Sequence, residues 1–219
     1  MSELVNFAMM VALTLSILVI LVLQPKTGFA TIRMKMKKAI PAQWEFSEFI
    51  KLKPNKLKTN QYYSFSEETV RSLGHRYIGR FDGAVLHWET KPVLDFVIEF
   101  KFPVKQLPER ARKEDVFQSG LYALALMESG VSCSSSKLVS IYCLQDKAER
   151  CLTRKSNKDC WRCRDGKMFV TKFNHKSVLE KLKQLDQVWY EGRRPRPSQD
   201  IRSCSVCPYS NGRCNYALT

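Results

Sequence analysis

The sequence predicts an α/β fold in which a central mixed sheet is flanked by helices. Residues 93–102 alternate apolar side chains with others, and residues 75–89 are rich in Tyr, Ile, Phe, Val and Trp, so both segments predict strands. Residues 109–128 and 175–191 repeat their apolar side chains with the spacing of an α-helix. The order of helix, strands, helix, two strands and helix is typical of a sheet with helices packed on its faces.

The N-terminal segment predicts a membrane anchor. Residues 4–23 carry no charge and are long enough to cross a bilayer as one helix, so residues 1–30 form the predicted anchor and its flank. The basic residues that follow are Lys26, Arg33, Lys35, Lys37 and Lys38. The positive-inside rule therefore predicts a single-pass protein whose C-terminal domain is cytoplasmic. A cleaved signal peptide is the alternative, which the length of the apolar run and the absence of a preceding Lys or Arg disfavour.

The two predicted strands form a hairpin that brings charged side chains together. Residues 90–92 allow the chain to turn between the strands. A period of two predicts Leu94, Phe96, Ile98, Phe100 and Phe102 on one face and Asp95, Val97, Glu99 and Lys101 on the other. The hairpin therefore places Asp82, from the first strand, beside Glu99.

Asp82, Glu99 and Lys101 have the side chains that metal-dependent phosphodiester hydrolysis requires. Two carboxylates offer the hard oxygen ligands that Mg²⁺ or Mn²⁺ prefers. The metal polarises the phosphate and lowers the pKa of a bound water. A lysine two residues from the glutamate points to the same side, where it can orient the water or stabilise negative charge. The alternative is an amphipathic strand with a solvated Glu–Lys pair.

The rest of the predicted core, residues 31–192, contains further elements and an insertion. Residues 41–53 predict a short helix, and residues 137–144 and 167–173 predict two more strands. Between these strands, residues 145–166 are polar and basic and contain three cysteines. This composition predicts an inserted hairpin or a small metal-bound loop.

The tail, residues 193–219, predicts a metal cluster. Its three cysteines, here named the C-terminal cysteines, are Cys204, Cys207 and Cys214. A Cys-x2-Cys spacing suits zinc or an iron–sulfur cluster, because it holds two thiolates on one tight turn. A reducing cytoplasm would keep all eight cysteines as thiols and so favours metal over disulfides. A second Cys-x2-Cys pair, Cys160 and Cys163, supplies a fourth ligand to this cluster or binds separately with Cys143 and Cys151.

The net charge of +15 predicts a polyanionic partner, and nucleic acid is the simplest one. The residues predicted to contact phosphates are Arg80, Arg193, Arg194 and Arg196. The alternative is a basic surface that lies near anionic lipid head groups. The basic residues at 35–38, close to the predicted anchor, suit that alternative.

Three motifs in order resemble a known nuclease family. They are Gly79-Arg80-Phe81-Asp82, Glu99-Phe100-Lys101 and Gln118-Ser119-Gly120-Leu121-Tyr122. Together with the C-terminal cysteines, they resemble the RecB-like branch of the PD-(D/E)XK nucleases, and within it the CRISPR-associated exonucleases of the Cas-four family. The resemblance covers residues 65–216. It implies a restriction-endonuclease-like core with its site at the open edge of the sheet.

The resemblance also implies an activity and a cofactor. It implies exonuclease action on single-stranded DNA ends, as in CRISPR spacer processing or DNA repair, with Gln118 and Tyr122 supporting the site or contacting the substrate strand. In that family, three C-terminal cysteines and one upstream cysteine hold a 4Fe–4S cluster. Here no cysteine precedes Cys133, so the fourth ligand stays open, with Cys160 and Cys163 as candidates. The helix in residues 41–53 also lacks the histidine that completes the family's metal site, and the N-terminal anchor departs from the family.

Two alternatives assign no catalysis to this chain. One is a nucleic-acid-binding membrane protein on the same fold, with a structural zinc site in the tail. The missing upstream histidine and cysteine favour it, and the intact Asp82, Glu99 and Lys101 oppose it. The other is a zinc-containing membrane adaptor, which the basic charge opposes.

Overall fold

The structure is a computed structural model that describes residues 9–16, 27–52, 61–153, 160, 163, 165–194, 201–210 and 212–218. The chain divides into two compact units, Met1–Val178 and Leu179–Thr219. The first unit contains the sheet and the residues predicted to be catalytic. The second contains the C-terminal cysteines.

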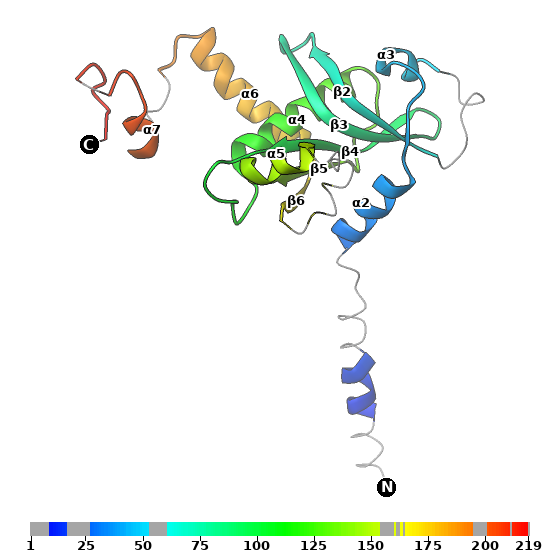
Figure 1. Cartoon of the computed structure of the whole chain (residues 1–219). Coiled ribbons are helices and arrows are strands. Elements are labelled where there is room, and N and C mark those ends of the chain that lie inside the picture. The colour runs from blue at the N-terminus through cyan, green and yellow to red at the C-terminus, as the bar shows by residue number, and fades with distance from the viewer. Residues whose placement is uncertain are drawn as a thin grey trace. The chain divides into compact units, whose positions relative to one another are not determined.

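A six-stranded mixed sheet forms the centre of the first unit, which confirms the predicted α/β class (Figure 1). The strands are β1 (Ile40–Pro41), β2 (Tyr62–Ser72), β3 (Tyr77–Trp88), β4 (Pro92–Lys101), β5 (Lys137–Tyr142) and β6 (Lys167–Lys172). They lie side by side in chain order. The pairs β1–β2 and β4–β5 are parallel and the other pairs are antiparallel. The predicted hairpin is therefore confirmed as β3 and β4.

Helices cover both faces of the sheet (Figure 1). In the first unit the helices are α2 (Thr27–Lys38), α3 (Phe46–Phe49), α4 (Lys113–Glu128) and α5 (Gln145–Thr153). Helix α6 (His175–Trp189) begins in the first unit and continues into the second, which also contains α7 (Ile201–Ser205). On one face, Ile32 of α2 packs in a buried apolar cluster with side chains of β3, β4 and β5. On the other face, the ring of Phe81 contacts Phe46 of α3 and Tyr122 of α4. The crossover helix α4 joins β4 to its parallel neighbour β5, because parallel strands cannot be joined by a tight turn.

The alternation predicted for residues 93–102 is wrong at its start. Val85 pairs with Phe96 and Leu86 pairs with Leu94, so a β-bulge leaves Asp95 without a partner on β3. The extra residue of a bulge points its side chain out of phase with the strand. Asp95 therefore faces α2, where it forms an ion pair with Lys35, instead of sharing a face with Glu99 as predicted.

Two predictions concern segments that the structure describes only in part. Of the predicted anchor, only residues 9–16 are described, and they are helical. Within the described part of the chain, no helix combines the length and the apolar character that crossing a membrane requires. In the predicted loop 145–166, residues 145–153 instead form α5, while residues 154–159, 161–162 and 164 lie outside the description.

Candidate active site

Strands β3 and β4 separate at the two predicted metal ligands. Their ladder ends at the pair Gly83 and Ile98, so Asp82 and Glu99 lie just beyond the last paired residues. The Phe100 N–H donates to Oδ2 of Asp82 over 2.6 Å, in place of a carbonyl of β3. Because a buried N–H needs an acceptor, this bond fixes the Asp82 carboxylate between the strands.

The backbone is distorted opposite Asp82. The register of β2 on β3 places Glu67 across from Asp82, and Glu67 has a φ of 58°. In β3, Phe81 and Trp88 are an odd number of residues apart, yet both rings contact α3, so the alternation is interrupted between them. A residue other than glycine in the left-handed region costs on the order of 1–3 kcal/mol, and such residues collect at functional sites.

Glu99 is buried beside Lys101 with half of its carboxylate unpaired. Glu99 is 4% exposed, and its Oε1 accepts a hydrogen bond from Lys101 Nζ over 2.8 Å. No donor among the described residues reaches the buried Oε2 of Glu99. A buried carboxylate oxygen without a donor is unfavourable, so this atom is suited to a cation.

Helix α4 holds Lys101 from the other side. Oε1 of Gln118 accepts a second hydrogen bond from Lys101 Nζ over 2.8 Å. The amide of Gln118 in turn donates to the Tyr122 hydroxyl over 2.6 Å. The glutamine and tyrosine singled out in the sequence therefore form one hydrogen-bonded chain that ends on the lysine.

Gly79 makes room for this chain. A Cβ atom at Gly79 would lie 2.6 Å from Cε1 of the Tyr122 ring, closer than real Cβ contacts allow. We expect Gly79→Ala to displace Tyr122, break its bond to Gln118 and lower any activity of the site by roughly 10–100-fold. Gly74→Ala is the matched control, because its Cβ would meet only the Glu128 carboxylate, at 3.7 Å. Rate measurements on both variants test this, and equal rates would contradict it.

Asp115 is a site residue that the sequence analysis missed. Its Oδ1 lies 3.7 Å from Lys101 Nζ, and the Tyr142 hydroxyl donates to its Oδ2 over 2.6 Å. The Arg112 N–H donates to the same hydroxyl over 3.0 Å. Its spacing in the sequence could have identified Asp115 as a site residue. It precedes Gln118 by three residues, so the two side chains share a face of α4.

The electrostatics of the site favour a bound cation. Burial raises the pKa of Asp82 above its usual value, with a smaller opposite contribution from the Phe100 N–H. Burial also raises the pKa of Glu99; the bond from Lys101 opposes this and the charge of Asp82 adds to it. Two carboxylates that are desolvated and repel each other gain stability when a divalent metal binds between them.

Lys101 is a cation in this setting. Burial acts to lower its pKa, but the hydrogen bond and charge of Glu99 and the charge of Asp115 outweigh burial, so the net pKa is raised. A charged lysine cannot accept a proton as a general base. Its chemistry here is to orient groups and to stabilise negative charge.

The other predicted site residues do not all join this centre. Arg80 forms an exposed ion pair with Glu67 over 3.0 Å. In the second unit, the Arg193 guanidinium donates to the carbonyls of Gln184 and Arg194. Arg196 lies outside the described residues.

The C-terminal cysteines lie on α7 and the turns after it. Cys204 is buried, and the Cys207 N–H donates to its carbonyl over 3.1 Å. The Leu218 N–H donates to the Cys204 sulfur over 3.5 Å. Among the described residues of the whole chain, no three His, Cys, Asp or Glu side chains stand close enough to hold a metal as they are.

We compared the chain with protein-family models and with curated protein sequences. No family model and no curated protein matches it. The side-chain geometry on β3, β4 and α4 is therefore what supports a function for this protein.

Proposed function

We propose that this protein is a metal-dependent DNA exonuclease that hydrolyses phosphodiester bonds at single-stranded ends. The observation that carries the proposal is the buried Glu99 carboxylate. One of its oxygens binds Lys101, the other has no donor among the described residues, and Asp82 lies beside it. Desolvated carboxylates next to a lysine form a centre for a divalent metal and for negative charge that develops in a reaction.

Asp82 and Glu99 would hold Mg²⁺ or Mn²⁺, for which carboxylate oxygens are the preferred ligands. When bound, the metal supplies Lewis-acid activation of the phosphate and of a water. Lys101 then stabilises negative charge on the phosphate, and Gln118 keeps its ammonium group in position. Tyr122 and Asp115 fix that arrangement from α4, since each contacts a member of the chain around the lysine.

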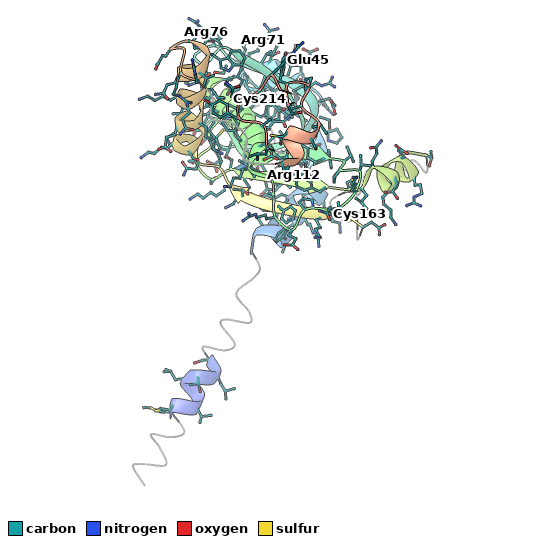
Figure 2. All side chains as sticks on the ribbon, turned by 90° about the vertical axis from the view of Figure 1, so that its left-hand side faces the viewer. Glu45, Arg71, Arg76, Arg112, Cys163 and Cys214 are labelled. Atoms are coloured by element: carbon teal, nitrogen blue, oxygen red, sulfur yellow. The ribbon has the colours of Figure 1, made fainter. Side chains whose placement is uncertain are left out.

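The loop after Lys101 suits a single-stranded substrate. It connects β4 to α4, so both of its ends lie at the site, and it carries the exposed basic residues Lys105, Arg110 and Arg112. Arg112, the last of them, is labelled in Figure 2. The Phe102 side chain, directly after the catalytic strand, is 50% exposed. Basic residues that follow the phosphates and an aromatic ring that stacks on a base are the usual means of binding single strands.

The motifs extend the proposal to family and cofactor. We propose a restriction-endonuclease-like core of the RecB-like branch, acting in CRISPR adaptation or in DNA repair. Its support is the ordered set Gly79, Asp82, Glu99, Lys101, Gln118 and Tyr122. Hydrogen bonds join the last four in a chain, Asp82 accepts the Phe100 N–H beside Glu99, and Gly79 leaves room for the Tyr122 ring. The C-terminal cysteines would hold a 4Fe–4S cluster, with zinc as the other thiolate-binding metal for this spacing.

The activity is tested on the full chain purified in detergent. We expect linear single-stranded DNA to be shortened with Mn²⁺ or Mg²⁺ and to stay intact with EDTA. Circular single-stranded DNA, which has no ends, should persist under the same conditions. Cutting of the circle at the same rate would contradict exonuclease action while leaving nuclease action in place.

We also propose that residues 4–23 tether the protein to a membrane as a single span, with the C-terminal domain on the cytoplasmic side. The uncharged run and the basic residues after it support this. A reporter fused after Thr219 should behave as cytoplasmic, and the protein should stay with membranes through a carbonate wash. Secretion of a shortened chain that begins near Thr31 would instead show a signal peptide.

A further inference from the structure

Four cysteines outside the catalytic site lie after β5, on α5 and on the segment that leads into β6. They are Cys143, Cys151, Cys160 and Cys163, here named the core cysteines. The first is buried directly after β5, and the second lies on α5, which begins two residues later. All four belong to the first unit, Met1–Val178.

The chain returns to Cys143 after α5. Beyond α5, the Cys163 N–H donates to the Cys160 carbonyl over 3.2 Å. Cys160 packs against the apolar cluster beneath the sheet. Three residues past Cys163, a Cβ at Gly166 would lie only 2.9 Å from the carbonyl of Tyr142, the residue before Cys143. The position of Cys163, on the segment that leads into β6, is labelled in Figure 2.

The four thiols also interact electrostatically. Burial raises the pKa of Cys143, and the next contributions come from the thiols of Cys163, Cys151 and Cys160. Thiols that raise the pKa of one another lie close together. Their thiolate forms would repel each other, and a cation bound between them would remove this repulsion. None of these four cysteines forms a disulfide.

We propose that the core cysteines bind one Zn²⁺ as four thiolates, at a site separate from the C-terminal cysteines. Four thiolates are a common tetrahedral set for structural zinc, and a Cys-x2-Cys turn supplies two of them. Because the thiols are not at ligand distance as they stand, binding would draw α5 and the turn at Cys160 toward Cys143. The free energy of metal binding would then stabilise residues 145–166, as in other small zinc sites.

The site would also brace the catalytic strand. The Cys143 N–H donates to the Lys101 carbonyl over 3.0 Å, and the Gln145 N–H donates to the Pro103 carbonyl over 3.2 Å. Zinc bound to Cys143 would therefore hold residues 143–145, which bond to the end of β4 and to the residues just after it. This role is structural, and the zinc site holds whether or not the protein cuts DNA.

The test uses the full chain, purified with reductant and without oxygen, and measures its zinc by elemental analysis. The Cys160→Ser/Cys163→Ser variant should lose one equivalent of zinc and become sensitive to protease within residues 145–166. The matched controls are Cys133→Ala, at a buried cysteine whose sulfur contacts the Ala123 and Val131 carbonyls, and Cys207→Ser/Cys214→Ser. Both controls should keep that equivalent.

A second measurement avoids variants that fail to fold. A chain in which the three C-terminal cysteines are replaced by serine is loaded with Co²⁺ in place of zinc. We expect thiolate-to-cobalt absorption with the intensity of four sulfur ligands and a tetrahedral visible spectrum. A spectrum without sulfur ligation, unchanged zinc in the Cys160→Ser/Cys163→Ser variant, or iron with sulfide at these cysteines would each overturn the zinc proposal. None of these outcomes bears on the carboxylate site.

Discussion

Replacing Glu99 with Gln or Lys101 with Ala is expected to lower the rate of DNA cleavage by at least ~100-fold, because each removes a charged group that acts in the transition state. Glu99→Gln keeps the shape of the side chain but removes the negative charge that holds the metal. Lys101→Ala removes the cation that two hydrogen bonds now hold in place. The affinity for DNA should persist in both variants, since many exposed basic residues contribute to it.

The controls are charge changes of the same kind away from the site. Glu114→Gln alters an exposed carboxylate in the first turn of α4, and Lys172→Ala alters an exposed lysine at the end of β6. Both should cut DNA at the wild-type rate. Wild-type rates in Glu99→Gln or Lys101→Ala would show that cleavage occurs elsewhere or belongs to a contaminant.

Asp82→Asn is expected to abolish activity to a similar degree, at least ~100-fold, and yet to stabilise the metal-free protein. The carbonyl oxygen of the substituted amide can still accept the Phe100 N–H, while the buried charge and its repulsion of Glu99 disappear. We expect the melting temperature in EDTA near pH 7 to rise by roughly 2–4 °C, the range of a modest gain in a protein of this size. The increase in melting temperature that Mn²⁺ causes in the wild type should be lost.

The pH dependence follows from the direction of the pKa shifts. The pKa values of Asp82 and Glu99 are raised in the folded state, so the folded chain binds these protons more tightly than the unfolded chain does. Their contribution to stability is therefore largest at acid pH and is lost as the pH rises through the unfolded and then the folded pKa. Melting curves in EDTA should show a smaller loss for Asp82→Asn over this range. Asp146→Asn, at an exposed position on α5, should follow the wild type.

The central hairpin and its charged residues could be predicted from the sequence, because both depend on local patterns. The strand predicted for residues 93–102 is β4, which spans Pro92–Lys101. The spacing of Glu99 and Lys101 already places both side chains on one face of a strand, and the four-residue spacing of Gln118 and Tyr122 places both on one face of a helix. These arguments need no knowledge of distant contacts.

Other features depend on contacts that no local pattern contains. Strand β2 is absent from the sequence-based expectations, because its buried residues Phe65 and Val70 fall out of phase on either side of the strained Glu67. The position of Asp95 depends on a bulge, and at this position its carboxylate contacts His87 and Lys35. Asp115 resembles an ordinary acidic residue in the first turn of a helix, and only the parallel strand β5 brings Tyr142 to it.

The apolar stripe predicted for residues 175–191 shows the same limit of periodicity. Val178 and Leu182 are buried, while Leu185 is 43% and Trp189 77% exposed. A helical period identifies which residues share a face. It does not say how far along the helix another part of the chain covers that face, because this depends on where the neighbouring elements end.

One measurement tests the central proposal most directly. The full wild-type chain is mixed with end-labelled single-stranded DNA, and binding and cutting are followed in the same sample with Mn²⁺, with Mg²⁺ and with EDTA. The proposal predicts binding in all three samples and progressive shortening of the DNA only where a metal is present. A chain that binds the DNA tightly yet leaves it intact with both metals would contradict a nuclease and support a non-catalytic nucleic-acid-binding protein.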